Sequence, residues 1–475
     1  MDFNIFLNEE ENYKYYILKL LDLKRNSFFS QKQISELLGI SRYKFEKFLR
    51  EIELDGEAIQ LPIRIQIENS GEIVSKGINN LTVKKIRLYY LEQSIQYQLL
   101  DIILSGRPPS AEFVADKLFI SRAAVYKDIK KLNISLKKFG LKIKNFILVG
   151  EEIAIRSFWF SLLNEFYCGI GLPFDKRVLQ KINEFKILLF ADENIYPTKV
   201  QEYRIDLFLG ITFVRSSRNN FLNKEDVIVS NINYLAYIKL FPRLTEENQN
   251  NYKIEIQNIL FFCYTEGFIL KKKDVKLSKE LEKRIELLNT LLTQKLKSSF
   301  SVCNDDLACI EIDMLRINRK WLYFHFIDTT FIYESQKSYF QEVYFECDSF
   351  IRNFFKGKNL EELFKYPEEK IKIYYDYLFL LTTKIPTYKL EEAIHICVDF
   401  SHGDLYNEFI KKSIESFKDL NVIFEHKATA KTQIYISDFV LSNTVCKQII
   451  WKNPPTPSDW KYFGNMIVKL KGGEE

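Results

Sequence analysis

The chain has 475 residues, of which 47% are hydrophobic, so it is long enough for about three domains and apolar enough to be ordered nearly throughout. Its formal net charge is only +5, but residues 12–150 carry 24 Lys and Arg against 14 Asp and Glu, a basic excess that favours a phosphate-rich partner. The acidic start, the short apolar runs and the seven scattered cysteines exclude a secreted, membrane-spanning or disulfide-framed protein and predict a cytoplasmic one.

Residues 1–78 are predicted to form a first winged helix-turn-helix domain. A helix over 12–26 precedes a capped helix pair, Ser30 to Arg50, and IRIQIEN, Ser70-Gly71 and EIVSKG then have the pattern of strand, tight turn and strand. Ser41 is the expected N-cap of the second helix of the pair. The candidate DNA-binding residues of this helix are Ser41, Arg42, Tyr43, Lys44 and Lys47.

Residues 79–160 are predicted to repeat this plan. A helix over 82–104 leads to a second pair, Ser110 to Lys131, whose inner face is expected to bury Phe113, Val114, Leu118, Ile120, Val125 and Ile129. LKIKNFILVG and EEIAIR are expected to form a longer hairpin with Gly150 at its turn. The candidate DNA-binding residues here are Ser121, Arg122, Tyr126, Lys127, Lys130 and Lys131 on the second helix, with Lys142 and Lys144 on one face of the wing.

A shift of 80 residues superposes the two helix pairs without a gap. Ser110 then falls on Ser30 and Ser121 on Ser41, and buried positions fall on buried positions. A single such stretch would more simply be an amphipathic helix pair in a bundle. The repeat with matched caps and basic faces favours two DNA-reading units instead.

The rest of the chain changes character twice. Long helical patterns with few glycines predict all-α bundles over 161–275 and 276–385. Residues 390–475 have the order strand, loop, helix, strand, strand, which predicts a small α/β domain with a parallel sheet. The predicted fold is therefore multi-domain and mostly α.

This order of domains resembles the Mga/AtxA family of global virulence regulators from Gram-positive bacteria. The residues that carry the resemblance best are FFSQKQISELLGISRYKFEKFLREI and PPSAEFVADKLFISRAAVYKDIKKLN, followed by the wing LKIKNFILVGEE. The resemblance implies that the two bundles are similar to phosphotransferase-system regulation domains (PRD) and that the C-terminal domain is similar to an enzyme IIB (EIIB). It also implies self-association, as a homodimer or a higher oligomer, through the C-terminal domain.

The chain departs from that family where phosphate chemistry would be expected. Residues 157–275 contain no histidine, so His325 in the second bundle is the candidate for phosphorylation by phosphotransferase-system proteins, although its neighbours WLYFHFIDTTF favour a partly buried structural role. The loop SHGD after the first C-terminal strand lacks the phosphocysteine of an active EIIB, and Cys397 falls within the strand. No enzyme activity, cofactor or metal is therefore expected.

The sequence favours a DNA-binding global transcriptional regulator controlled by its C-terminal half. Since its basic face is rich in Lys and poor in Asn and Gln, selection of AT-rich, bendable promoter DNA by shape is expected. The alternatives are an RNA-binding antiterminator linked to the phosphotransferase system, and a phosphocarrier.

Overall fold

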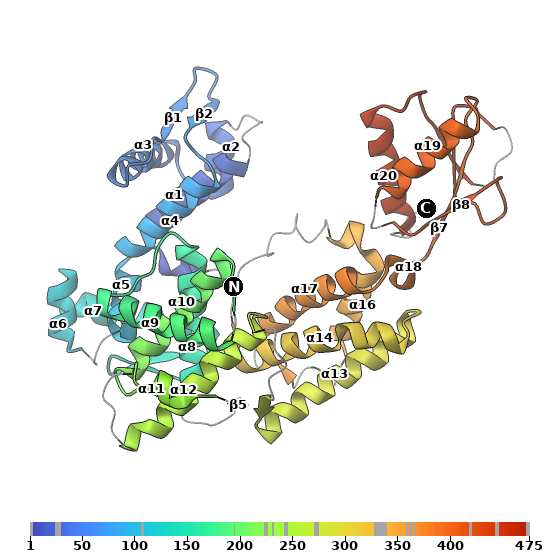
Figure 1. Cartoon of the computed structure of the whole chain (residues 1–475). Coiled ribbons are helices and arrows are strands. Elements are labelled where there is room, and N and C mark those ends of the chain that lie inside the picture. Colours follow the sequence, from blue (N-terminus) through green and yellow to red (C-terminus); the bar gives the residue numbers. More distant parts are fainter. Residues whose placement is uncertain are drawn as a thin grey trace. The chain divides into compact units, whose positions relative to one another are not determined.

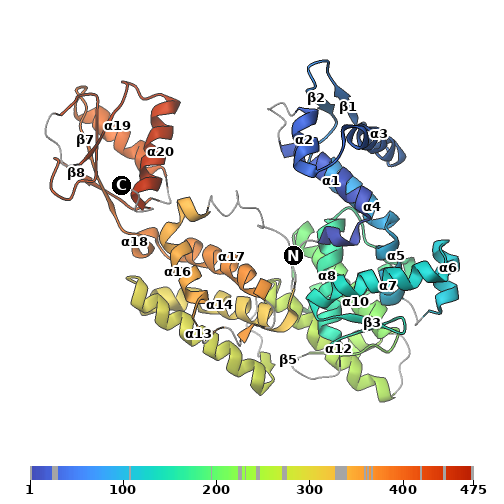
Figure 2. The ribbon, with the colours of Figure 1, turned by 180° about the vertical axis from the view of Figure 1, so that it is seen from behind.

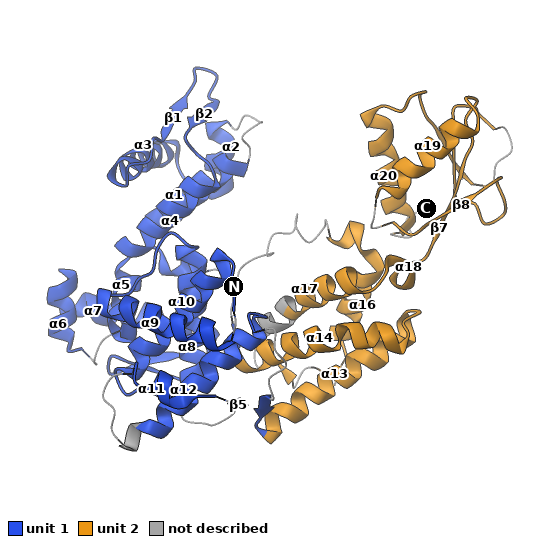
Figure 3. Ribbon diagram, in the orientation of Figure 1, with its two compact units in different colours: residues 1–278, 324–329 blue, residues 279–323, 330–475 orange. Residues whose placement is uncertain are grey.

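The computed structural model of the chain describes residues 3–23, 30–105, 109–193, 195–222, 227–229, 232–241, 246–269, 275–326, 340–357, 360, 363–364, 367–417, 420–441 and 446–471 (Figure 1). The chain divides into two compact units (Figure 3). Unit 1 comprises residues 1–278 with 324–329, and unit 2 comprises residues 279–323 with 330–475. None of the helices in the described ranges is both long and apolar enough to cross a membrane.

Unit 1 begins with a three-helix unit and a short hairpin. Its elements are η1 (Phe3–Phe6), α1 (Glu9–Leu23), α2 (Gln31–Leu38), α3 (Arg42–Ala58), β1 (Arg64–Ile67) and β2 (Ile73–Lys76). The strands pair antiparallel, with Arg64 opposite Lys76, and an isolated bridge ties Ser30 to Glu72 beside them. The predicted order of elements is therefore observed, with the first helix beginning three residues earlier than expected and its predicted end, 24–26, outside the described residues.

A second set of the same kind follows. It comprises α4 (Asn80–Gln93), α5 (Ile95–Ser105), α6 (Ala111–Leu118), α7 (Arg122–Leu136), η2 (Lys137–Phe139), β3 (Lys142–Lys144) and β4 (Ile147–Val149). The single helix predicted over 82–104 was wrong, because the chain breaks at Ser94. Ser94 adopts an extended conformation and its Oγ donates a hydrogen bond of 2.5 Å to the carbonyl of Phe6, which fixes the break against η1.

The prediction of a long second hairpin turning at Gly150 was also wrong. The turn is at Asn145 and Phe146, which both have positive φ, as a tight two-residue hairpin turn requires. Gly150 instead permits a close approach, since a Cβ there would lie 2.5 Å from Leu141 Cδ2. The segment EEIAIR opens helix α8 (Glu152–Tyr167), whose buried residues continue at helical spacing far beyond it.

The inner face of the second helix pair is largely as expected, with one exception. Val114 and Val125 are fully buried, and Leu118, Ile120 and Ile129 are half-buried. Phe113 was expected inside and is 53% exposed, because Val114 and Ala115 are the buried residues of that turn of α6.

The remainder of unit 1 is a helical bundle. Its elements are α8, α9 (Lys176–Glu193), α10 (Lys199–Ser216), α11 (Tyr234–Ile238) and α12 (Glu246–Thr265), with strands β5 (Val227–Val229) and β6 (Val275–Leu277). The two strands pair antiparallel, so the expectation of an all-α region was not met in full. Stacked aromatic rings fill the core, with Phe208 and Phe262 4.1 Å apart between ring centroids and Phe324 and Phe326 packed against them.

Unit 2 contains a second helical bundle and an α/β domain. The bundle comprises α13 (Lys279–Ser299), α14 (Asn304–Phe324), α16 (Phe345–Phe355), α17 (Pro367–Lys384) and the short α18 (Thr387–Leu390). Buried Tyr377 of α17 donates a hydrogen bond of 2.6 Å to Asn318 Oδ1 of α14. This bond joins two helices of the bundle through its interior.

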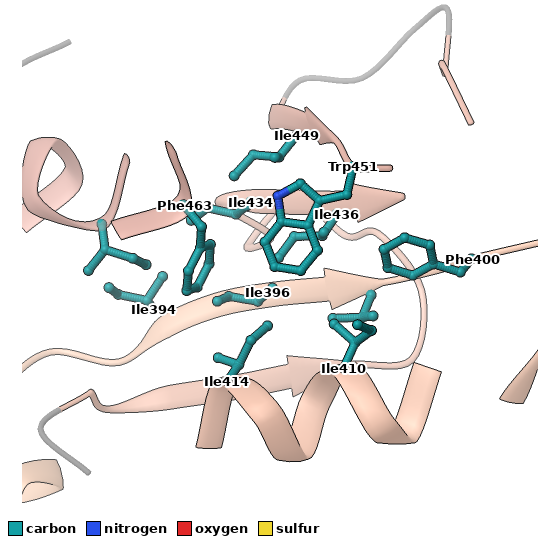
Figure 4. Packing of buried hydrophobic residues seen from close by; sticks show 12 residues of the cluster. Ile394, Ile396, Phe400, Ile410, Ile414, Ile434, Ile436, Ile449, Trp451 and Phe463 are labelled. Atoms are coloured by element: carbon teal, nitrogen blue, oxygen red, sulfur yellow. The ribbon is translucent and has the colours of Figure 1, made fainter. Parts of the chain in front are cut away.

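The C-terminal domain has the parallel sheet that the sequence predicted. Its elements are β7 (Ile394–Val398), α19 (Asp404–Glu415), β8 (Val422–Glu425), β9 (Ile434–Ser437), β10 (Lys447–Ile450) and α20 (Pro457–Lys471). The strands lie in the order β10-β9-β7-β8 and every pairing is parallel. Alternate residues such as Ile394 and Ile396 bury one face of the sheet against Ile410, Ile414 and Phe463 of the two helices (Figure 4).

Candidate nucleic-acid interface

Serine caps fix where the candidate recognition helices begin. Ser121 Oγ accepts a hydrogen bond of 3.1 Å from Ala124 N at the start of α7, and Ser41 Oγ accepts one of 3.2 Å from Lys44 N at the start of α3. The turns before these caps also correspond under the 80-residue shift, because Gly39 and Phe119 both adopt the left-handed conformation. The repeat seen in the sequence is thus a repeat in backbone geometry.

The basic side chains of α7 lie on its solvent side. Ser121, Arg122, Tyr126, Lys127, Lys130 and Lys131 are all exposed. Arg122 forms an ion pair of 2.8 Å with Glu112, but both side chains are more than half exposed, so this pair is weak and its guanidinium can exchange partners. Lys127 and Lys130 form no ion pair with any described residue. The helix therefore offers cations that a phosphate or a base edge can take up.

The second wing is fixed beside α7 (Figure 2). Asn133 Oδ1 accepts a hydrogen bond of 2.6 Å from Ile143 N, and Asn133 Nδ2 donates one of 3.1 Å to Ile143 O. Ile143 is buried, so Lys142 and Lys144 point together to the opposite, solvent face of β3. The predicted wing lysines and the predicted helix residues consequently belong to one rigid basic element.

The basic side chains of the first winged unit are arranged differently. Arg42 pairs with Glu46 at 3.0 Å, and Lys47 pairs with both Glu10 and Glu51. The hydrogen bond that Lys47 Nζ donates to Glu10 Oε2 is the main reason that the pKa of Lys47 is raised. Lys44 lies 5.0 Å from the ring centroid of Tyr13 in α1, on the same side as Lys47. Ser41 and Tyr43 are exposed.

A groove of about 1220 Å³ lies between α2, α3 and the first wing. The face of α3 that lines it carries Arg42, Glu46 and Arg50, and the wing turn 68–71 closes the other side. Neither Lys44 nor Lys47 is among the lining residues, so the predicted site residues of α3 divide between two faces. Sequence reasoning selected outward basic residues and missed Glu46 and Arg50, although their spacing of four and eight from Arg42 was a usable signal.

The two winged units, 30–77 and 109–150, also differ in charge. Residues 109–150 contain nine Lys and Arg against three Asp and Glu, whereas residues 30–77 contain seven against eight. The basic excess found in the sequence therefore resides in the second winged unit and not in the first. A DNA duplex would be attracted chiefly by the second winged unit.

Cys397 of β7 is poorly suited to phosphate chemistry. Burial raises the pKa of the Cys397 thiol to about 11, which makes it a poor nucleophile. In the loop after β7, the Ser401 N–H donates to Asp438 Oδ1 at 2.9 Å and the Phe400 N–H donates to Asn407 Oδ1 at 2.8 Å. Among the described residues, no group of three or more His, Cys, Asp and Glu could hold a metal ion.

His325 occupies an unusual backbone position. Its φ is +52°, and it stands between Phe324 and Phe326, whose buried rings stack 5.0 Å apart. The histidine itself is half-buried. The structure thus places the candidate phosphorylation residue at the edge of an aromatic core.

Comparison with known proteins agrees with this geometry. Residues 79–163, which contain α6, α7 and the second wing, match the family model described as the Mga helix-turn-helix domain. A protein of Streptococcus pneumoniae serotype 4 named "Putative trans-acting regulator" is 19% identical over 489 residues, which cover 96% of this chain and 97% of that protein. The resemblance to Mga-family regulators expected from the sequence is confirmed, and these findings support a DNA-binding transcriptional regulator.

Proposed function

We propose that this chain is a cytoplasmic, non-enzymatic transcriptional regulator whose second winged unit anchors it to promoter DNA. One observation carries the proposal: the exposed cations of α7 and of β3 stand on a single rigid element within the segment that matches a helix-turn-helix family model. In the proposed complex α7 enters the major groove, while Lys142 and Lys144 bind phosphates.

The site composition favours recognition of DNA shape. Lysine is a point charge that binds phosphate without reading sequence, and among the exposed residues of α7 only Arg122 has the fork that contacts guanine in a bidentate manner. Specificity then depends largely on how easily the duplex deforms, which favours AT-rich, bendable promoters.

Equilibrium binding of the full chain across a salt series tests the proposal. The probes are an AT-rich curved duplex, a GC-rich duplex and an RNA hairpin, and we expect the curved duplex to bind best with a steep negative salt slope. Preference for the RNA hairpin would favour the antiterminator, and binding to none of the probes would refute the regulator.

Two variants locate the interface. Arg122→Ala should change sequence preference by ~1–3 kcal/mol, and the pair Lys142→Ala with Lys144→Ala should weaken all duplexes alike and reduce the salt slope by about 2. Lys199→Ala in α10, whose side chain is 96% exposed, is the matched control. Unchanged affinity in the first two variants would place the interface elsewhere.

The proposal assigns self-association to the C-terminal domain. Leu405 and Phe409 of α19 are 90% and 58% exposed, and Val440 is 75% exposed. Val440 follows the carboxyl end of β9, and α19 follows the carboxyl end of the parallel strand β7. Such an apolar surface suits an interface between copies of the chain. Leu405→Asp should lower the molar mass measured by light scattering, whereas Lys199→Ala should leave it unchanged.

Control by phosphotransferase-system proteins is the remaining part of the proposal. Its only histidine candidate in the bundles is His325. Incubation with a phosphorylated histidine carrier should label the wild type and not His325→Asn if the bundles are regulated in this way. Absence of label in the wild type would give His325 a purely structural role, and onward transfer of the label to a sugar would favour the phosphocarrier.

A further inference from the structure

The groove of the first winged unit contains a charged hydrogen-bond acceptor, the Glu46 carboxylate, which is held in place on α3. Glu46 Oε1 accepts a hydrogen bond of 2.9 Å from Gln31 Nε2 and one of 3.0 Å from Arg42 Nε. Gln31 is buried, so the donor that orients the carboxylate is itself held in place. These two bonds, that from Gln31 first, lower the pKa of Glu46 and keep it charged.

The second oxygen of this carboxylate is unoccupied. Both hydrogen bonds reach Oε1, and Oε2 has no partner among the described residues. The side chain is 31% exposed and lines the groove. Glu46 therefore presents one oriented, partly exposed acceptor atom to whatever enters the groove.

Within duplex DNA, few groups suit such an acceptor. Phosphates repel it, whereas the exocyclic amino groups of the major groove donate hydrogen bonds, and a carboxylate accepts characteristically from cytosine N4. Arg42 and Arg50 line the same face of α3, four residues to either side. They are suited to the phosphates or to the guanine of the same base pair.

The equivalent position of the second unit has a different chemistry. The 80-residue shift places Tyr126 at the position of Glu46. Tyr126 packs edge-on against Phe146 of the wing, with ring centroids 6.1 Å apart. The two recognition helices thus share a backbone plan and differ at the residue that faces the wing.

We infer that the first winged unit selects a base and that Glu46 is its specificity-determining residue, accepting a hydrogen bond from cytosine N4 in the major groove. This inference rests on the proposed function, because it requires the chain to bind duplex DNA. The second winged unit then supplies most of the affinity, and the first adds discrimination at a C·G pair at the cost of some repulsion from the phosphates.

The experiment selects duplexes from a randomised library with the full chain and with Glu46→Ala, and measures affinity for an unselected duplex at fixed salt. In Glu46→Ala we expect discrimination at one C·G pair to fall by about 5- to 150-fold, since a good base contact is worth ~1–3 kcal/mol. Affinity for the unselected duplex should rise, because a negative charge leaves the groove. Glu36→Ala is the matched control, since Glu36 lines the same groove and pairs only with exposed Lys32.

The control should raise affinity for the unselected duplex without changing base preference. Equal base preference in Glu46→Ala and the wild type would overturn the inference while leaving the proposed function intact. A uniform loss of affinity together with a lower unfolding midpoint would overturn it too, by making Glu46 a support for Arg42. If Glu46→Ala unfolds, the isosteric Glu46→Gln is measured instead. Its amide offers a donor beside its acceptor oxygen, so the preferred base at that position should change from cytosine towards adenine. If the wild type binds no duplex at all, the proposed function fails with the inference.

Discussion

Asn133 of α7 and Ile143 of β3 exchange two hydrogen bonds, from Ile143 N to Asn133 Oδ1 and from Asn133 Nδ2 to Ile143 O. In the first winged unit, Glu53 Oε1 of α3 likewise accepts a hydrogen bond of 2.7 Å from Ile65 N of β1. Each recognition helix therefore holds the first strand of its own wing by a side chain three turns from its start. In both cases side-chain hydrogen bonds join the helix to its wing.

Asn133→Ala removes both hydrogen bonds between α7 and β3. It leaves the N–H and the carbonyl of Ile143 without their partner, which we expect to lower the free energy of unfolding by ~1–3 kcal/mol. Denaturant unfolding measures the loss. Glu53→Gln, which keeps an acceptor oxygen for Ile65 N, is the control and should cost far less. An Asn133→Ala variant as stable as the wild type would show that the wing is held by packing alone.

A buried ion pair in the first bundle is the second feature to test. Arg156 Nη2 donates to Glu255 Oε1 at 2.8 Å, and the side chains are 1% and 0% exposed. Glu255→Leu should destabilise the protein by ~3–5 kcal/mol, because it leaves the Arg156 guanidinium buried beside a single remaining carboxylate, Glu152.

The double variant Arg156→Met with Glu255→Leu separates the pair from its surroundings. Removing both charges avoids an uncompensated buried ion, so the double variant should be much more stable than Glu255→Leu alone. Thermal unfolding of the two single variants and the double variant gives the coupling. Additive losses would mean that the two side chains contribute independently.

Sequence patterns predicted the parts of this fold that depend on local chemistry. Serine caps such as Ser121 and the short, continuous apolar run that forms β7 are short-range signals, and they located both helix pairs and the parallel sheet. The pairing of β5 with β6 was missed because two three-residue strands, Val227–Val229 and Val275–Leu277, lie far apart in the sequence. Such strands have too few residues to show a period.

The candidate site was predictable only in part. Exposed basic residues on one face of α7 follow from helical spacing alone. Which face of α3 meets the wing depends on the position of the turn 68–71, a tertiary relationship that leaves no periodic signal. Glu46 was passed over for that reason, since a carboxylate on a DNA-reading helix gains significance only from the groove around it.

The ion pair between Asp306 and Lys389 in the second bundle should make stability depend on acid pH. The hydrogen bond from Lys389, followed by that from Cys303, lowers the pKa of Asp306 from 3.8 to about 2. Because the folded pKa is the lower one, this stabilisation is fully present above pH ~4 and is lost as the pH falls towards 2. Unfolding at a series of pH values should show a steeper loss in that window for the wild type than for Asp306→Asn. Parallel curves would remove Asp306 as the cause.

The turn before α7 contains the last feature with a measurable cost. Phe119 has a φ of +54° and is 95% exposed, whereas Gly39 occupies the equivalent turn of the first unit with a φ of +65°. A side chain in the left-handed region costs of order 1 kcal/mol, and an exposed ring recovers none of that by burial. Phe119→Gly should therefore stabilise the protein by up to ~1 kcal/mol, less the entropy that glycine adds to the unfolded chain.

The converse variant, Gly39→Phe, should destabilise it by a similar amount, since nothing lies within 4 Å of a Cβ built there and only the backbone conformation opposes it. Denaturant unfolding of both variants is the measurement. A loss of stability in Phe119→Gly would show that the phenyl ring makes a stabilising contact that outweighs its backbone strain.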